Sequence, residues 1–263
     1  MQPFLKWAGG KRWLFDGAFI SALPPYRRYV EPFLGGGAGF FALQPARALL
    51  SDLNADLINL YLTVRDHPKA LRKLILQYHD LHSREFYYAM RAHKPRSPIK
   101  AAARMLYLNR TCWNGLYRLN RHGDFNVPMG TKTAVSLPSD DFDQLSALLT
   151  GVELRICDFA DTIRTARSGD LLFVDPPYTV KHNMNGFVKY NERIFSWSDQ
   201  VRLRDALSGA ADRGASIILM NAHHDSIREL YSGFGVQTQV LRKSIISGKT
   251  DGRSQISELM VRL

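Results

Sequence analysis

The clearest hydrophobic pattern in the chain is a run of apolar residues that ends abruptly at an acid. Residues 171–174 are four apolar side chains in succession, which is typical of a strand buried on both faces. Pro176 and Pro177 have no N–H for a sheet ladder, so the strand must end before them. The motif Asp175-Pro176-Pro177-Tyr178 is therefore predicted at the carboxyl end of a strand, where open α/β sheets bind ligands.

The remaining pattern alternates between short apolar runs and helical periodicity. Further strands are predicted at residues 29–33, 48–54, 152–156, 215–220, 236–241 and 256–261. Helical spacing predicts helices over residues 56–80, 86–90, 99–108 and 199–213. Ser198 is the predicted N-cap of the last helix. The strand at 29–33, the glycine loop after it and the helix that follows form the first unit of a nucleotide-binding α/β fold.

The glycine loop and the acid after the next strand indicate the ligand. The GxGxxG/A pattern matches only from Gly37 through Gly39 to Ala42, and Asp52 follows Gly37 by 15 residues. An acid at that place can accept hydrogen bonds from both hydroxyls of a ribose. The loop has no Lys-Ser or Lys-Thr of the kind that binds triphosphates. An adenosyl ligand without phosphate therefore fits this loop better than a nucleoside triphosphate.

The residues of the acid-proline motif suit activation of a flat amine. The Asp175 carboxylate and the Pro176 carbonyl can accept the two hydrogens of an exocyclic base amine and stabilise the positive charge that develops on it. Neither proline has a backbone donor that competes there, and Tyr178 can stack on the base. The alternative is a strand that simply ends in a Pro-Pro turn, with Asp175 as a turn acid.

Charge points to a polyanionic partner. The 263 residues contain 35 Lys and Arg against 24 Asp and Glu, a net charge of +11, and residues 91–132 hold nine of the cations and a single acid, Asp124. Within that segment, residues 111–128 interleave arginine, asparagine and aromatic side chains between turn signals. This pattern predicts a hairpin or paired loops that read and stack on bases, although a charge run can also be an ordinary solvated face.

Other features narrow the class of protein. The length fits either one large α/β domain with an insertion or two domains. Cys112 and Cys157 are too few for a zinc site and are expected to act as small apolar residues in a reducing compartment. His223 and His224 follow a strand end and are read as structural or substrate-lining. The chain has no apolar run of membrane-spanning length and no signal-peptide pattern at its start. The polar loop at 179–197 is either a mobile lid or an ordinary surface loop.

Five motifs in this order make the chain similar to the Dam-type DNA adenine-N6 methyltransferases over nearly its whole length. The N-terminal cofactor motif of that family is similar to Phe4-Leu5-Lys6-Trp7-Ala8-Gly9-Gly10-Lys11, and its glycine motif is similar to Glu31-Pro32-Phe33-Leu34-Gly35-Gly36-Gly37. Its ribose-binding acid is similar to Asp52-Leu53-Asn54, and its catalytic motif is similar to Asp175-Pro176-Pro177-Tyr178. Its recognition region is similar to Asn109-Arg110 with residues 114–118 and 125–128. Trp113 stands where the family usually has tyrosine, and Met220-Asn221-Ala222-His223 differs from the Ser-Asn of many relatives.

The resemblance implies a fold, a cofactor and a set of residues. The expected fold is α/β, with a Rossmann-like methyltransferase sheet in residues 1–55 and 149–263 and an inserted, mainly helical DNA-recognition domain with a β-hairpin in residues 56–148. The expected methyl donor is S-adenosylmethionine, giving S-adenosylhomocysteine as product, with no metal. The implied catalytic residues are Asp175, Pro176 and Tyr178. The implied cofactor-binding residues are Trp7, Lys11, Glu31, Phe33, Gly35, Gly37, Asp52 and Asp175. The implied DNA-binding residues are Lys6, Arg110, Trp113, Asn114, Leu116, Arg118, Asn126 and Pro128.

The expected activity is methylation of adenine in a short duplex site, of which GATC is the family's best-known example. The expected partner is double-stranded DNA, with no membrane, and we expect a monomer in the cytoplasm of a bacterium or a phage-infected cell, associated with the nucleoid. Two alternatives stay open: a methyltransferase of RNA or of a protein amide, and a DNA-binding homologue without catalysis. Membership of a restriction-modification, phage or housekeeping system is also open.

Overall fold

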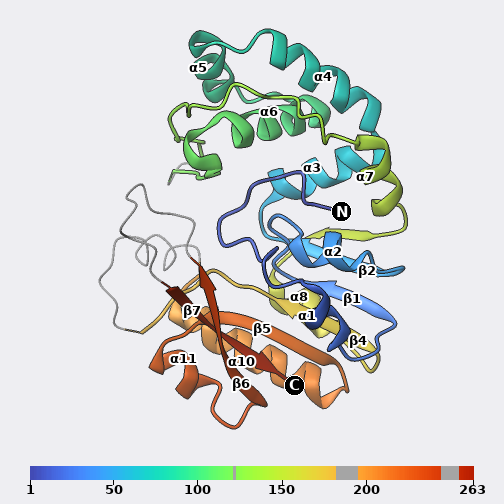
Figure 1. Cartoon of the computed structure of the whole chain (residues 1–263), viewed down its shortest axis with the longest axis vertical. Coiled ribbons are helices and arrows are strands. Elements are labelled where there is room, and N and C mark those ends of the chain that lie inside the picture. Colours follow the sequence, from blue (N-terminus) through green and yellow to red (C-terminus); the bar gives the residue numbers. More distant parts are fainter. Residues whose placement is uncertain (121–122, 182–194, 244–254) are drawn as a thin grey trace. The chain divides into compact units, whose positions relative to one another are not determined.

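The computed structural model describes residues 1–120, 123–181, 195–243 and 255–263, which pack as two compact units (Figure 1). Unit 1 comprises Met1–Phe15, Leu34–Gln44 and Asp52–Ile156, and unit 2 comprises Asp16–Phe33, Pro45–Ser51 and Cys157–Leu263. The N-terminal segment and the glycine loop thus pack in the same unit as the segment predicted to recognise DNA. The predicted domain boundaries, at 55/56 and 148/149, were drawn by function and stay a prediction.

A seven-stranded sheet runs in the order β3-β2-β1-β4-β5-β7-β6. Its strands are β1 (Arg28–Glu31), β2 (Ala48–Asp52), β3 (Glu153–Ile156), β4 (Asp170–Val174), β5 (Ser216–Ala222), β6 (Val236–Lys243) and β7 (Gln255–Arg262). Strand β1 pairs in parallel with β2 and β4, and β4 pairs in parallel with β5, whereas β7 is antiparallel to both β5 and β6. The predicted α/β class with a Rossmann-like sheet is confirmed. Because β2, β1, β4 and β5 are parallel, their carboxyl ends lie at one edge of the sheet.

One part of the core of unit 2 lies on a single face of its strands. Alternate residues of β4, β5 and β7 form a single buried apolar cluster: Leu172, Val174, Ile217, Leu219, Leu259 and Val261. Helices α8 (Phe159–Arg164) and α10 (Trp197–Asp212) join the same cluster through Phe159, Ile163, Leu203 and Leu207. The two-residue period of the strands and the helical period of α10 thus place their apolar sides against each other. This packing holds β4 as the buried strand that the apolar run predicts.

The helices of unit 2 differ from the prediction at one cap and in one element. The N-cap of α10 is Ser196 rather than the predicted Ser198, because Ser196 accepts from the Asp199 N–H at 3.2 Å and its own N–H donates to the Asp199 carboxylate at 2.9 Å. A short helix that the pattern did not predict, α11 (Asp225–Leu230), follows β5 and is capped by His224. Helix α1 (Gly17–Ser21) precedes β1.

Unit 1 is mainly helical. Its helices are α2 (Ala38–Leu43), α3 (Ala55–Asp66), α4 (Pro68–Asp80), α5 (Arg84–Ala92), α6 (Pro98–Thr111) and α7 (Phe142–Leu149). The helical pattern over 56–80 is confirmed, and it is divided between α3 and α4, because the chain breaks at His67 and restarts with Pro68 at the first turn of α4, where proline needs no N–H partner. Helix α7 begins after the N-cap Asp141, whose side chain accepts from the Gln144 N–H. Among the described residues, no helix is long and apolar enough to cross a membrane.

Candidate active site and recognition loop

In unit 1, Asp52 is held by the backbone at the end of β2. Its Oδ2 accepts from the Gly35 N–H at 3.0 Å, and its Oδ1 accepts from the Asn54 N–H at 2.9 Å. Burial raises the pKa of the Asp52 carboxyl, and these backbone donors oppose that rise. Each carboxylate oxygen has a second lone-pair direction, so Asp52 can still accept hydrogen bonds from a vicinal pair of hydroxyls.

Two glycines of the loop are required by close approach. Gly35 has φ +47° and Gly37 has φ +67°, both in the left-handed region. A Cβ on Gly35 would lie 2.7 Å from Cδ1 of Trp7, and one on Gly37 would lie 2.8 Å from the Tyr61 hydroxyl oxygen. The Trp7 indole therefore lies directly on the loop, and the Tyr61 hydroxyl donates to the Gly35 carbonyl at 3.2 Å. The loop, Trp7 and Asp52 form one rigid group.

The other residues predicted to bind S-adenosylmethionine lie in different environments. In unit 1, Lys11 is 2% exposed and its Nζ donates to the Gly9 carbonyl at 2.7 Å. In unit 2, Glu31 ends β1, is buried, and accepts from the Tyr29 hydroxyl at 3.1 Å. Phe33 packs with its ring centroid 5.3 Å from that of Phe159. A buried carboxylate and an aromatic ring therefore lie at the carboxyl end of β1.

The catalytic motif leaves β4 at the carboxyl edge of the sheet. Pro176 is buried, and Tyr178 is partly buried with its hydroxyl donating to Oε2 of Glu258 at 2.9 Å. Burial, followed by the negative charges of Asp175 and Glu258, raises the pKa of Tyr178 well above its ordinary value. Tyr178 is thus a neutral phenol whose hydroxyl end is fixed inside unit 2. Asp175 is the first residue after the strand, so its backbone position is set by β4.

In unit 1, Lys6 is fastened to the recognition segment through Asn109. The Lys6 N–H donates to Oδ1 of Asn109 at 3.1 Å, and Nδ2 of Asn109 donates back to the Lys6 carbonyl at 2.7 Å. Asn109 is completely buried, whereas the Lys6 side chain is exposed. Lys132 lies beside Lys6 and lowers the pKa of the Lys6 ammonium. The neighbouring ammonium groups of Lys6 and Lys132, with the Lys6 backbone held by Asn109, favour binding of an anionic or electron-rich group.

The segment at 111–128 folds as turns with two isolated antiparallel bridges rather than as a laddered hairpin. The bridges join Cys112 to Met129 and Leu119 to Phe125. The short 3-10 turn η1 (Trp113–Gly115) lies between them and has Asn114 at φ 56°. The Trp113 side chain is 53% exposed, which is unusual for so large an apolar side chain. The backbone N–H of Trp113 donates to the Pro128 carbonyl at 2.9 Å. The segment presents an aromatic ring to solvent on a backbone that is fixed from both sides.

Arg118 and Asn126 form the polar part of this segment. Nε of Arg118 donates to Oδ1 of Asn126 at 3.1 Å, across the turn that links the two bridged strands. Asn114 and Asn126 are exposed, Leu116 is half-buried and Pro128 is exposed. The structure therefore brings the predicted DNA-binding residues other than Lys6 and Arg110 onto a single loop of unit 1.

Arg110 lies in a different environment from the rest of the predicted DNA-binding set. It is 7% exposed, and its two terminal nitrogens donate to both oxygens of Asp140 at 2.6 Å, with a further bond to the Val135 carbonyl at 2.7 Å. A buried, two-pronged ion pair of this kind ties α6 to the segment before α7. The structure thus gives Arg110 a structural role, and its direct contact with DNA is a prediction that this burial disfavours.

Several residues that contact the predicted site residues escaped the sequence pattern. Asn109 belongs to the recognition motif, but no periodicity in the sequence shows that its side-chain amide hydrogen-bonds the Lys6 backbone. Tyr117 stacks on Trp7 with centroids 6.0 Å apart and an interplanar angle of 19°, which joins the N-terminal motif to the recognition loop within unit 1. Glu258 belongs to β7, and only the fold shows that its partner is Tyr178. His223 bonds Ser257 through Nδ1 at 3.0 Å and His224 caps α11.

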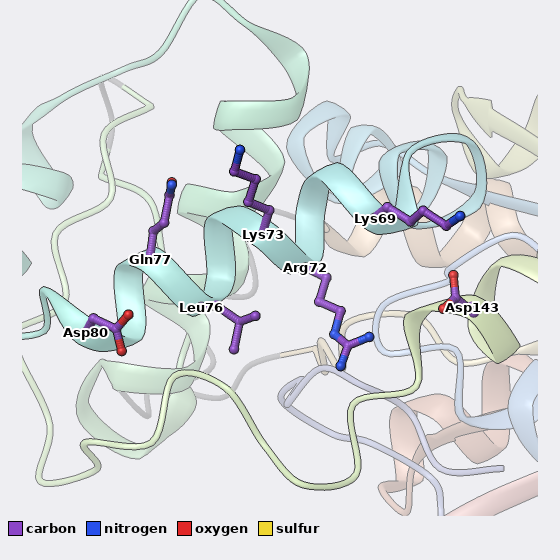
Figure 2. Close-up of a pocket in the computed structure, with 7 residues that line it drawn as sticks. All are labelled: Lys69, Arg72, Lys73, Leu76, Gln77, Asp80 and Asp143. Atoms are coloured by element: carbon purple, nitrogen blue, oxygen red, sulfur yellow. The ribbon is translucent and has the colours of Figure 1, made fainter.

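A pocket of about 450 Å³ opens on unit 1 away from these residues in sequence. Figure 2 shows its lining along α4, with Asp143 contributed by α7. The seven lining residues are Lys69, Arg72, Lys73, Leu76, Gln77, Asp80 and Asp143. None of them belongs to a predicted motif, and the mixture of cations and acids is that of a solvated helix face. Among the described residues, no group of three or more His, Cys, Asp or Glu side chains could hold a metal ion.

Comparison with known proteins assigns the motifs to one family. The family model described as D12 class N6 adenine-specific DNA methyltransferase matches residues 7–245. The type II methyltransferase M1.LlaDCHI of Lactococcus lactis subsp. cremoris is 33% identical over 270 residues, covering 99% of this chain and 95% of that protein. The DNA adenine methylase of Escherichia coli K12 is 31% identical over 267 residues, covering 98% and 94%. The DNA N-6-adenine-methyltransferase of Escherichia phage P1 is 37% identical over 265 residues, which span 98% of this chain but 35% of the phage protein.

Proposed function

The chain belongs to the D12 class of N6 adenine-specific DNA methyltransferases, and we propose that it methylates an adenine flipped out of duplex DNA at a short site, with S-adenosylmethionine as donor. GATC is the site that the resemblance favours. The observation that carries the proposal is the motif Asp175-Pro176-Pro177-Tyr178 directly after the buried parallel strand β4. Strand ends of this kind are where α/β sheets bind their ligands.

The donor side of the proposal rests on Asp52, Trp7 and the glycine loop. S-adenosylmethionine supplies a methyl group that is activated by the positive charge on its sulfur. Asp52 accepts from the ribose hydroxyls, since its carboxylate is already oriented by the Gly35 and Asn54 N–H groups. The loop lacks a phosphate-binding Lys-Ser pair, and Trp7 covers it with an aromatic surface. These residues suit an adenosyl group without phosphates.

On the catalytic side, Asp175 and the Pro176 carbonyl accept the two N–H bonds of the adenine amine. Their acceptor oxygens stabilise the positive charge that the nitrogen gains during methyl transfer. Tyr178 stacks on the base and sets its plane. Much of the rate then comes from holding the amine in line with the methyl group.

The DNA side of the proposal uses the exposed residues of unit 1. Arg118 reads guanine, Lys6 contacts a second base, and the exposed Trp113 ring fills the duplex where the adenine has left. Asn114, Leu116, Asn126 and Pro128 line the same loop, and the excess of cations supplies the phosphate contacts that keep the protein on DNA.

The test is methylation with a radiolabelled donor offered with duplex DNA, RNA or protein. Label should enter a GATC duplex, and digestion of that duplex should release labelled N6-methyl-2′-deoxyadenosine. Duplexes with one base pair of the site changed should accept much less label. Label in RNA or in protein but not in duplex DNA would overturn the proposal, and equal label in all duplexes would overturn the GATC assignment alone.

A further inference from the structure

Glu258 is a carboxylate buried in strand β7 of unit 2. It is 3% exposed, and the next three residues of β7, Leu259, Met260 and Val261, are all buried and apolar. Burying a carboxylate is costly unless hydrogen bonds stabilise it. An apolar side chain would suit packing alone at this position. Packing alone therefore does not explain why a carboxylate lies at position 258.

The strand register brings this carboxylate to the catalytic motif. Glu258 pairs with Ala222, the last residue of β5, and β5 runs parallel to β4. Glu258 thus lies at the edge of the sheet where the motif leaves β4. There its Oε2 accepts from the Tyr178 hydroxyl at 2.9 Å, across 80 positions of sequence.

The backbone that follows Tyr178 is also fixed by buried side chains. Thr179 donates through Oγ1 to the Phe195 carbonyl at 2.6 Å, and Gln200 donates through Nε2 to the Thr179 carbonyl at 3.3 Å. Gln200 in turn accepts from Asn221 at 3.0 Å, and all three side chains are completely buried. A tyrosine has only two side-chain torsions. With its backbone held at one end and its hydroxyl held at the other, the position of the ring is determined. Because the hydrogen of a phenolic hydroxyl prefers to lie in the plane of the ring, the direction of the Glu258 acceptor also orients that plane.

We propose that Glu258 is a positioning residue that fixes the Tyr178 ring as the platform on which the flipped adenine stacks. The inference rests on the proposed function, because it takes Tyr178 as the stacking residue. Glu258 itself touches neither the base nor the donor in this role. Its effect on methyl transfer passes through the angle of the ring, which decides how the adenine amine meets Asp175.

The experiment combines three variants with a probe of stacking. Glu258→Ala removes the acceptor, Glu258→Gln keeps an acceptor oxygen without the charge, and Tyr178→Phe removes the donor while keeping the ring. The probe is a duplex with 2-aminopurine in place of the target adenine, whose fluorescence rises when the base is flipped and falls when it stacks on a ring. Single-turnover methylation of the unmodified duplex is measured in parallel.

Glu258→Ala should lower the single-turnover rate by roughly 10- to 100-fold, the range expected when a reacting group is misplaced by about 1 Å. It should also raise the fluorescence of the bound probe, since the ring no longer holds the base. Tyr178→Phe should reproduce both changes, and adding Glu258→Ala to it should lower the rate little further. Glu258→Gln should recover most of the rate and of the quenching.

The exposed Glu229 of α11 provides the matched control, and Glu229→Ala should behave as wild type in both measurements. A wild-type rate in Tyr178→Phe would overturn the inference even if Glu258→Ala failed to fold. Loss of rate in Glu258→Ala with unchanged probe fluorescence, or additive losses in the double variant, would mark Glu258 as merely structural. Failure of the wild-type protein to methylate duplex DNA would instead overturn the proposed function.

Discussion

Asp52 and Tyr178 are held in place in opposite ways. Asp52 takes its orientation from two backbone N–H groups, at separations of 17 and 2 residues in sequence. Tyr178 takes its orientation from a side chain, Glu258, that lies 80 residues away on an antiparallel strand. Any residue except proline supplies a backbone N–H, whereas a side-chain acceptor exists only while that one residue is kept. The orientation of Asp52 should therefore survive replacement of Asn54, although not of Gly35, whose Cβ would meet Trp7. The orientation of Tyr178 should not survive replacement of Glu258.

The largest effect should come from the catalytic side, at Asp175. Asp175→Ala should lower the methylation rate by about 100- to 1,000-fold, because a group that stabilises developing charge is worth that much in comparable sites. DNA binding should stay within a few-fold of wild type, since Asp175 acts mainly on the nitrogen that becomes charged. Single-turnover rates and a DNA titration measure the two quantities. Near-normal turnover would refute the assigned chemistry.

A smaller effect is expected on the donor side, at Asp52. Asp52→Ala should weaken binding of S-adenosylmethionine by about 1.5–3 kcal/mol, the usual value of hydrogen bonds to a charged group. Asp52→Asn keeps one acceptor oxygen and should lose less. Calorimetry with the donor alone measures both variants, and Asp66→Ala, at an exposed acid of α3, is the control. Unchanged affinity in Asp52→Ala would place the ribose elsewhere.

The recognition loop offers a case between the two, since Arg118 is held by a side chain only eight residues away. Because Nε of Arg118 donates to Asn126, the two terminal nitrogens are the ones that can meet O6 and N7 of guanine. Arg118→Ala should cost about 1–3 kcal/mol at the cognate site and relax discrimination at one base pair.

The measurement is the methylation rate on the cognate duplex and on each single-base variant. Arg118→Lys is the matched variant, because lysine rescues a phosphate contact better than a two-pronged base contact. A uniform loss across all duplexes, together with a salt slope smaller by about one unit, would show that Arg118 holds a phosphate.

The same contrast explains what the sequence could and could not predict. The glycine loop, Asp52 and the acid-proline motif were predictable because local rules govern them: φ values open to glycine, missing N–H groups of proline, and apolar runs of strand length. Glu258, Asn109 and the ion pair of Arg110 with Asp140 were not, since each depends on a partner brought near only by the fold. The burial of Arg110 also had no signal in the sequence, and its place among the DNA-binding residues stays a prediction.

Helix ends show the limit of local rules most simply, and α10 tests it with the smallest effect. Both Ser196 and Ser198 precede an apolar periodic segment, and the pattern alone favoured Ser198. In the structure Ser196 exchanges hydrogen bonds with Asp199 in a capping box. Ser196→Ala should therefore lower the free energy of unfolding by about 1 kcal/mol, and Ser198→Ala by much less. Chemical denaturation of both variants measures the difference.

Because α10 carries Gln200, which holds the backbone after Tyr178, Ser196→Ala should also raise the temperature sensitivity of methylation while leaving the affinity for S-adenosylmethionine unchanged. Equal stability losses in the two variants would show that the two serines share the cap, and a change in donor affinity would show that the catalytic and donor sides are not held independently.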